Sequence, residues 1–234
     1  MEFGELNITA SRAFWDDYEN IDGDQPVEPI RIEWKWLENH SIEDFKNVKT
    51  FVILEGERMR NRISQDAVIP ICQLQHQKVF IYTSREKETA ICISEETNLN
   101  TFGTIGESIA DFINSSAVKD VNVVTVNTLP ISSYKIGTDE SLGGGIIIRG
   151  ITSGKPLATV PELMEPNILT GVSAAVASHR HQLNKSFSSY AIYMDSTKTR
   201  FEATPSITSF IHSIGLTSNL FRDGHAMDES GLYT

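Results

Sequence analysis

Short apolar runs separated by polar turns make up the first half of the chain. Ile32, Trp34 and Trp36 alternate with polar residues, which is the period of a strand buried on one face. Four continuous apolar runs follow, and a strand buried on both faces, as in a parallel sheet, has this form. These runs are TFVIL at 50–54, AVIPI at 67–71, KVFIY at 78–82 and TAICI at 89–93. The pattern therefore predicts five strands before residue 94.

A helical period replaces the strand pattern after residue 104. Thr104 and Glu107 have the spacing of a capping box, which satisfies two backbone amides at the start of a helix. The apolar residues after Thr104 recur every three or four positions, so they share one face of a helix that ends near Asn114. These residues are Ile105, Ile109, Phe112 and Ile113.

The second half continues the alternation of strands and helices. VNVVTV at 121–126 and SSYAIYMD at 188–195 predict strands, and the apolar positions between 167 and 182 predict a helix. A last helix starts at Thr204-Pro205, a capping residue followed by proline, and ends at Gly215. Its apolar face consists of Ile207, Phe210, Ile211 and Ile214. Residues 132–161 are rich in Gly, Ser and Thr, and predict a long irregular segment with one short apolar piece at 146–148.

Strands interleaved with helices predict an α/β fold, a three-layer sandwich around a mostly parallel central sheet. We place a single α/β domain at residues 29–222. Residues 16–28 carry six acidic residues and no basic one, so residues 1–28 are expected to form a disordered acidic leader. The final segment, 223–234, lacks an apolar stripe and is expected to be a flexible tail.

Charge and composition argue against several classes of function. The 234 residues carry a formal net charge of −11, whereas nucleic-acid binding and anchoring to anionic lipid both need a basic surface. No apolar run approaches the roughly 20 residues of a membrane span, and we expect no signal peptide at the amino terminus. Cys72 lies in the strand-like stretch AVIPICQL and Cys92 in TAICISEE, so we expect two buried, reduced thiols.

The motifs provide no catalytic, cofactor-binding or metal-binding set. Leu142–Gly145 is glycine-rich, but it lacks the Lys-Ser/Thr that completes a phosphate-binding P-loop. His179 and His181 lie two residues apart on a helix and point to different faces, so they cannot share a metal. The acidic pairs Glu95–Glu96 and Asp139–Glu140 lack the apolar surroundings that tune a carboxyl group for acid–base work. We therefore predict no enzyme activity, no cofactor and no metal.

The last three residues, Leu232, Tyr233 and Thr234, are the most informative feature of the chain. They offer an apolar side chain, a ring with a hydroxyl group, and a terminal carboxylate. A partner can bury the first, position the second, and pair the third with a lysine or with amide donors. These three residues are therefore the candidate site for binding a partner protein.

This ending has the form hydrophobic–Tyr–any residue, the motif that proteasome activators and assembly chaperones insert between α subunits of the 20S particle. The chain as a whole resembles the family of chaperones that assemble the 20S proteasome α ring. The stretches that carry the resemblance are Phe3–Glu5, Arg31–Trp34 with Trp36–Glu38, VKTFVILEG at 48–56 and, above all, residues 163–195, where Glu-Pro-Asn-Ile opens an Ala/Val helix before an apolar strand. The resemblance covers the whole chain loosely, residues 163–234 best, and the Gly-rich segment at 130–160 least.

The resemblance implies an ATP-independent, non-catalytic chaperone that acts as a heterodimer with proteasome assembly chaperone 2. Such a heterodimer sits on the outer face of the α ring, promotes its formation and prevents off-pathway association of α rings. Leu232, Tyr233 and Thr234 would then contact a pocket between α subunits. The resemblance further implies a cytoplasmic protein, with the nucleus and the endoplasmic reticulum left open, and no nucleic-acid or membrane partner.

Two other functions stay open at this level. An α/β enzyme of the nucleoside-phosphorylase or hydrolase type would need a pocket with convergent polar groups. A general adaptor would act through the acidic leader, so removing residues 1–28 would abolish its function and removing the tail would not.

Overall fold

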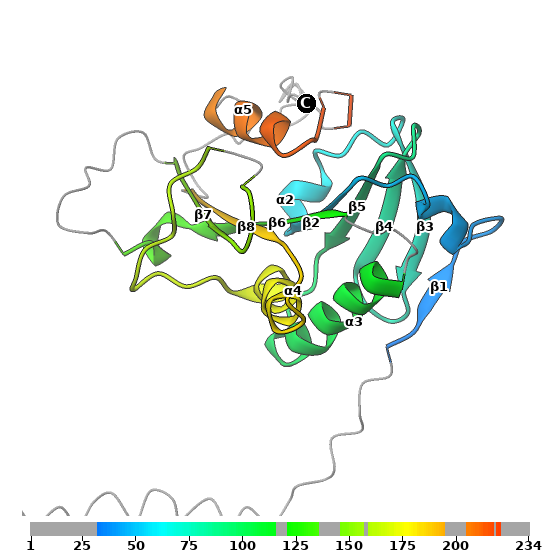
Figure 1. The fold of residues 1–234 in the computed structure, drawn as a ribbon, viewed down its shortest axis with the longest axis horizontal. Coiled ribbons are helices and arrows are strands. Elements are labelled where there is room, and N and C mark those ends of the chain that lie inside the picture. The colour runs from blue at the N-terminus through cyan, green and yellow to red at the C-terminus, as the bar shows by residue number, and fades with distance from the viewer. Residues whose placement is uncertain are drawn as a thin grey trace, which may run out of the picture. The chain divides into compact units, whose positions relative to one another are not determined.

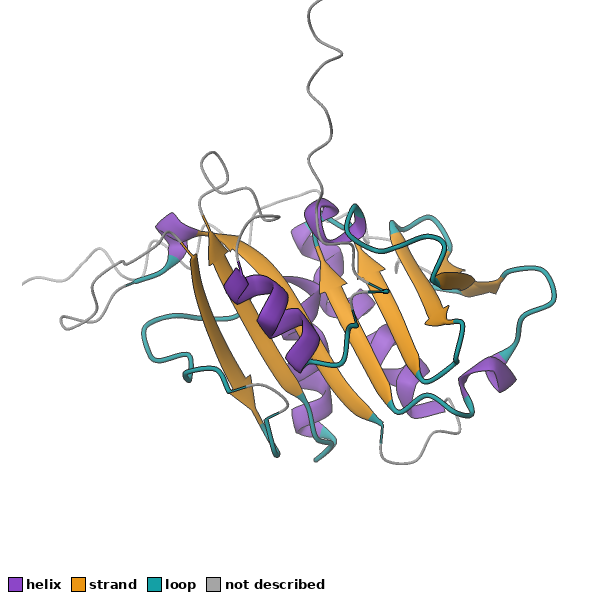
Figure 2. Ribbon diagram, turned by 90° about the horizontal axis from the view of Figure 1, so that it is seen from above, coloured by secondary structure: helices purple, strands orange, loops and turns teal. Residues whose placement is uncertain are grey.

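An eight-stranded sheet with helices on both of its faces forms the body of the protein (Figures 1 and 2). The computed structural model describes residues 32–115, 121–135, 146–156, 159–194, 205–217 and 219–220. The strands are β1 (Trp34–Trp36), β2 (Thr50–Glu55), β3 (Val68–Leu74), β4 (Val79–Ser84), β5 (Thr89–Ser94), β6 (Asn122–Pro130), β7 (Ile146–Thr152) and β8 (Ser188–Met194). The helices are α2 (Glu57–Arg60), α3 (Phe102–Ser115), α4 (Gly171–Gln182) and α5 (Pro205–Ser213), with 3-10 turns η1 (Ile42–Phe45), η2 (Leu99–Thr101) and η3 (Ile131–Ser133).

The strand order is β1-β3-β4-β5-β2-β6-β8-β7, and the sheet is mixed. Strands β5, β2, β6 and β8 run parallel to one another, whereas the four remaining pairings of neighbouring strands are antiparallel. The prediction of a mostly parallel sheet was therefore wrong. β3, β4 and β5 are joined by tight turns at residues 75–78 and 85–88. Connections this short permit only antiparallel neighbours, because a parallel crossover needs about a dozen residues or more.

Both faces of the sheet are covered, as the prediction of three layers requires. In β2, Phe51 and Ile53 point to the face under α3 and α4, while Val52 and Leu54 point to the face under α5. All four side chains are at most 1% exposed. Burying a side chain of this size stabilises a fold by about 1.5–3 kcal/mol. The apolar run at 50–54 thus reports burial on both sides of the sheet.

Helices α3 and α4 pack side by side at close range, because Gly106 faces Ala175 (Figure 1). A methyl group added at Gly106 would overlap the Cβ of Ala175 and crowd the backbone nitrogen of Val176. No larger side chain fits on α3 at this point without moving the helices apart. The glycine therefore sets the distance between the two helices.

Most predicted elements are found at the expected positions. β8 and the end of α3 agree with the sequence pattern. Of the four apolar residues expected on the last helix, Ile207, Phe210 and Ile211 form the buried face of α5, and Ile214, also buried, directly follows the helix. Gly215 follows that helix with a φ of +91°, the left-handed conformation that glycine adopts readily. Thr204, the expected cap of α5, lies outside the described residues. None of the helices in the described ranges has both the length and the apolar character needed to cross a membrane.

The predicted start of α3 was wrong. The helix begins at Phe102, so Thr104 and Glu107 lie inside it and cannot form the capping box. Asn98 caps the preceding turn η2 instead, where its Oδ1 accepts a hydrogen bond from the Asn100 amide at 3.1 Å. The helical segment therefore starts at the cap formed by Asn98, six residues before the expected cap Thr104.

Two further boundaries differ from the prediction. α4 begins at Gly171 and not near Asn167, because a φ of +82° at Gly171 prevents a helix from running through it. Residues 146–152, expected within an irregular segment, form the edge strand β7. β7 pairs antiparallel with β8 along its whole length, so β8 provides hydrogen-bond partners for the backbone of residues 146–152. Amino-acid composition alone does not reveal such a pairing.

Cys72 and Cys92 are buried and unlinked, as the sequence pattern predicts. They lie on β3 and β5, on either side of Ile81 in β4. Strands two positions apart are separated by about 9.5 Å, which is farther than a disulfide bond permits. Burial raises the pKa of Cys72 to about 12 and raises that of Cys92 as well. Both thiols are therefore protonated near neutral pH.

Candidate functional site

The residues of the predicted partner-binding site lie outside the described part of the chain. Leu232, Tyr233 and Thr234 belong to residues 221–234, so their role in binding stays a prediction. The glycine-rich segment at 142–145 and the pair Asp139–Glu140 also lie outside the described residues. Within the described body, polar side chains converge at the carboxyl ends of the central parallel strands.

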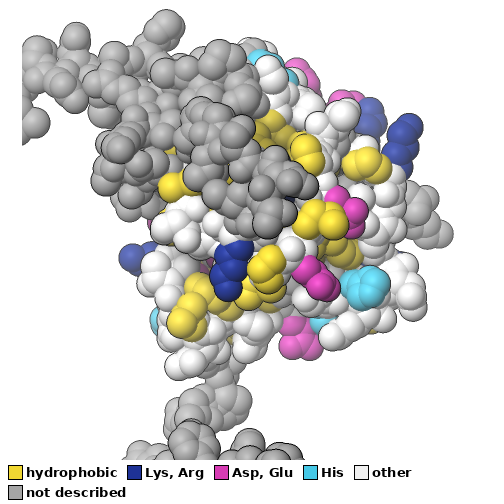
Figure 3. Space-filling view, turned by 90° about the vertical axis from the view of Figure 1, so that its left-hand side faces the viewer, with side chains coloured by type: hydrophobic (Ala, Val, Ile, Leu, Met, Phe, Trp, Pro, Cys, Tyr) yellow, Lys and Arg dark blue, Asp and Glu magenta, His cyan; other side chains and the backbone are white. Residues whose placement is uncertain are grey.

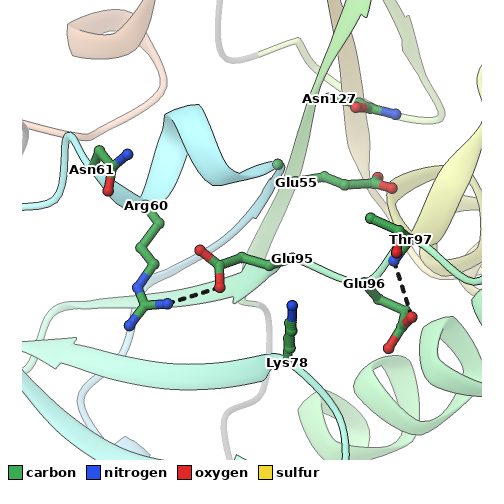
Figure 4. Close-up of a pocket in the computed structure, with 9 residues that line it drawn as sticks. Glu55, Arg60, Asn61, Lys78, Glu95, Glu96, Thr97 and Asn127 are labelled. Atoms are coloured by element: carbon green, nitrogen blue, oxygen red, sulfur yellow. Dashed lines mark hydrogen bonds and ion pairs between the residues drawn. The ribbon is translucent and has the colours of Figure 1, made fainter.

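A polar cavity of about 440 Å³ opens at these strand ends (Figure 4). Glu55 ends β2, Glu95 follows β5, and Asn127 lies in β6, so three neighbouring parallel strands each supply one residue to the cavity wall. Ligands of open α/β sheets bind at this edge. The remaining lining residues are Gly56, Arg60, Asn61, Lys78, Glu96 and Thr97.

Glu55 is bound to the start of helix α4. The amides of Val172 and Ser173 donate to its two carboxylate oxygens at 3.0 and 2.9 Å, and Glu55 is 7% exposed. Burial raises the pKa of Glu55 above its ordinary 4.5, although these hydrogen bonds lower it. The first amides of a helix have no partner within the helix and carry partial positive charge, so a carboxylate stabilises that end. Glu55 therefore caps α4 from a strand distant in the sequence.

Gly171 and Asn127 complete this connection between helix and sheet. A Cβ at Gly171 would overlap the Glu55 carboxylate, so only glycine lets the carboxylate reach the helix amides. The side-chain amide of Asn127 donates to the carbonyl oxygen of Thr170 at 3.0 Å. Glu55 and Asn127 thus attach the start of α4 to two neighbouring strands, which gives both residues a structural role.

Several of the charged side chains that line the cavity are held by hydrogen bonds. Arg60 Nη1 donates to Glu95 Oε2 at 2.8 Å, and Glu96 Oε1 accepts from the backbone amides of Thr97 and Asn98 (Figure 4). The carboxylates of the cavity are therefore engaged by helix amides, by a guanidinium group, or by their own loop. The lining residues include no Ser, Cys or His. A Ser–His or Cys–His pair is therefore not among the residues that line this cavity.

Sequence reasoning treated Glu95 and Glu96 as loop acids and did not single out Glu55 or Asn127. The position of these residues, just after predicted strands, could have identified them. Glu55 and Asn127 directly follow the apolar runs at 50–54 and 121–126, and Glu95 comes two residues after the run at 89–93. The carboxyl ends of parallel strands share one edge of a sheet, so polar residues at these positions meet there.

His179 and His181 face different neighbours, as their spacing predicts. The ring of His181 lies edge-on to that of Phe187, with 6.4 Å between the ring centroids. His179 Nε2 lies 3.3 Å from Asp111 Oδ1 on α3, and Glu107 lies one helical turn before Asp111. The structure thus brings His179 to two acidic residues with which sequence reasoning did not connect it.

The fold is shared with several solved structures at low sequence identity. A protein of unknown function from Thermoplasma acidophilum matches with a TM-score of 0.55 and 12% identity, over 75% of this chain and 80% of that chain. A Mycobacterium tuberculosis protein of unknown function matches with a TM-score of 0.53 and 10% identity, over 80% of this chain and 76% of that chain. PbaA from Pyrococcus furiosus, an archaeal homologue of proteasome-assembly chaperone, matches with a TM-score of 0.50 and 10% identity, over 78% of this chain and 79% of that chain.

No protein-family model matches the sequence, and none of the curated proteins matches it at a significant level. At identities of 10–12%, the solved structures establish the fold of the body.

Proposed function

We propose that this protein is a non-catalytic chaperone of 20S proteasome assembly, the counterpart of proteasome assembly chaperone 1. In this proposal it pairs with proteasome assembly chaperone 2, binds 20S α subunits, promotes α-ring formation and prevents off-pathway association of α rings. The observation that carries the proposal is the fold it shares with PbaA, in a chain whose last residues have the hydrophobic–Tyr–any form. We place the protein in the cytoplasm, without a cofactor and without nucleic-acid or membrane partners.

Features of the body support binding over catalysis. The carboxylates at the strand ends accept hydrogen bonds from α4, Arg60 and a loop, so each has a structural partner. Met164 and Ile168, in the segment between β7 and α4, are 66% and 70% exposed. On the side of the sheet that ends at β7, hydrophobic side chains lie among scattered charges of both signs (Figure 3). Met164 and Ile168 are the apolar side chains of this segment that a partner protein could bury.

In this proposal Leu232, Tyr233 and Thr234 anchor the chaperone to a pocket between α subunits. A buried leucine and a well-placed tyrosine each contribute about 1–3 kcal/mol. A contact from the terminal carboxylate to a lysine adds about 1.5–3 kcal/mol before desolvation. Ordering the tail offsets these gains, so the isolated tail binds weakly. Attachment to a body that also contacts the ring raises the effective concentration of the tail and strengthens its binding.

The proposal is tested by purifying the tagged protein from its own cells and by varying its tail. Chaperone 2 and α subunits are expected to co-purify. Deleting residues 232–234, replacing Tyr233 by alanine, or adding one residue after Thr234 is expected to weaken α-ring binding roughly 10-fold or more while leaving the heterodimer intact. Thr234→Ser is the control, because it keeps the carboxylate in place.

Each part of the proposal has its own contradicting result. If neither chaperone 2 nor α subunits co-purify, the chaperone assignment fails. If the shortened and extended tails bind the α ring as tightly as wild type, the tail is not the anchor. If removing residues 1–28 abolishes function and the tail variants retain it, the protein is an adaptor that acts through its acidic leader.

The cavity at the strand ends favours one competing function, that of an α/β enzyme of the nucleoside-phosphorylase or hydrolase type. Its place at the ends of parallel strands and its volume of about 440 Å³ suit a small ligand. Calorimetric titration with nucleosides and with inorganic phosphate separates the two functions. Binding that Lys78→Ala abolishes would support the enzyme, whereas the chaperone proposal predicts no binding and no turnover.

A further inference from the structure

Two acidic residues of α3 and one histidine of α4 meet on the surface of the helix pair. Glu107 and Asp111 lie one turn apart on the exposed side of α3, and His179 reaches toward them from α4. One potential ligand atom from each of the three residues lies within 4.8 Å of the other two. His179 Nε2 is within hydrogen-bond distance of this pair, at 3.3 Å from Asp111 Oδ1.

The electrostatics of this cluster favour a cation. Carboxylates at positions i and i+4 of a helix repel each other, and the imidazole offsets this repulsion only when it is protonated. The protein as a whole also carries a net charge of −11, which favours the approach of cations over anions. A bound divalent ion would neutralise both carboxylates at once.

The scaffold under the cluster is rigid. Glu107 directly follows Gly106, whose contact with Ala175 sets the spacing of α3 and α4. Asp111 and His179 each lie four residues further along those helices than Glu107 and Ala175, so they face each other one turn beyond the contact. Because helices hold side chains more precisely than loops do, the helix pair presents all three residues on one face, with their ligand atoms within 4.8 Å of one another.

The donor set points to the class of metal. Ligands held at about 2.0–2.1 Å from a tetrahedral zinc ion lie about 3.3 Å from one another. The hydrogen-bonded atoms of His179 and Asp111 have this spacing, and a Glu107 carboxylate oxygen lies within 4.8 Å of both residues' ligand atoms. Mixed imidazole and carboxylate donors suit Zn²⁺, whereas Ca²⁺ and Mg²⁺ prefer oxygen ligands alone. We propose that Glu107, Asp111 and His179 form a Zn²⁺ site that ties α3 to α4 and leaves a fourth coordination position open to solvent. The site does not depend on the proposed chaperone function.

The test is a titration of the untagged full chain with Zn²⁺ by calorimetry, and with Co²⁺ by visible absorption. We expect one ion per chain with a dissociation constant of about 10 µM or tighter, and a Co²⁺ spectrum without sulfur-to-metal charge transfer. His179→Ala and Asp111→Asn are expected to weaken binding roughly 10-fold or more. His181→Ala is the matched control, since it removes a histidine of the same helix that faces Phe187, and it is expected to bind as wild type does.

Several outcomes overturn the site. It is wrong if wild type binds neither ion, if His179→Ala binds as tightly as wild type, or if the Co²⁺ spectrum shows thiolate ligation by Cys72 or Cys92. If His179→Ala fails to fold by circular dichroism, His179→Gln takes its place, because it keeps the volume and removes the imidazole. Zn²⁺ is also expected to raise the unfolding temperature of wild type and of His181→Ala, and not of Asp111→Asn.

Discussion

The carboxylate of Glu55 accepts a hydrogen bond from the amide of Val172, 117 residues further along the chain, at 3.0 Å. This bond joins the end of the central strand β2 to the first turn of α4. The second carboxylate oxygen accepts from Ser173, so both oxygens are used. Glu55 thus helps, together with Asn127, to fix the start of α4 on the sheet, and with it the helix that carries His179.

Replacing Glu55 by alanine is expected to destabilise the protein by about 2–3 kcal/mol, because two buried amides lose a charged acceptor. Glu55→Gln is expected to cost less, about 1–2 kcal/mol, since the amide oxygen still accepts one bond. Unfolding in guanidinium chloride, followed by circular dichroism, measures both. The exposed Glu86→Ala serves as the control, with a change of about 0.5 kcal/mol or less. Equal stability of the Glu55 and Glu86 variants would contradict the capping role.

Two glycines of the same helix are expected to respond in opposite ways to alanine. Gly106→Ala forces a methyl group against Ala175 and is expected to destabilise the protein by about 1–3 kcal/mol. Gly103→Ala meets no atom within 4 Å and is expected to stabilise α3 by up to about 1 kcal/mol through helix propensity. Thermal unfolding of both variants tests this, and a stabilising Gly106→Ala would rule out the close helix contact.

Asp44 is expected to make part of the stability sensitive to acid. Its carboxylate accepts from Lys87 Nζ at 2.6 Å and from the Ser41 amide at 3.1 Å, and mainly the bond with Lys87 lowers the pKa of Asp44 from 3.8 to about 2. The unfolded chain therefore binds the proton more tightly than the folded protein does. The contribution is complete above about pH 4 and is lost as the pH falls toward 2.

Asp44→Asn is accordingly expected to cost about 1–2 kcal/mol near neutral pH, a value reduced for the solvent exposure of Lys87. Chemical unfolding between about pH 7 and pH 3 measures how the difference from wild type shrinks with acid. Lys87→Met removes the same partner, so the double variant is expected to lose less than the sum of the two single losses. A difference that stays constant over this range would show that Asp44 does not titrate as proposed.

Cys72 and Cys92 are expected to resist thiol reagents in the folded protein. Both are about 1% exposed or less, and burial raises the pKa of each, so the reactive thiolate is scarce. Neither thiol should react with a disulfide reagent under native conditions, and both should react in denaturant. Rapid modification of either cysteine in the native protein would contradict the buried positions on β3 and β5.

The strand positions follow from the sequence, whereas their directions required the tertiary structure. The run at 50–54 and the face of α5 are apolar because they are buried, and burial leaves its mark on residue type. The run at 89–93 is equally apolar, yet it pairs parallel with β2 and antiparallel with β4. The predicted runs 78–82 and 89–93 are separated by only six residues, which is too short for a parallel crossover. This spacing already indicated that the two strands are antiparallel.

By itself the sequence determined the α/β class and the buried thiols, since both depend on residue type and local order. Leu232, Tyr233 and Thr234 stay predicted binding residues. Only the tertiary structure placed Glu55 at the start of α4, and His179 beside Asp111 and Glu107. These contacts join residues 117 and 68 positions apart. A pattern in one chain reports which face a residue occupies, but not which distant residue occupies the same place, because that depends on how strands and helices pack together.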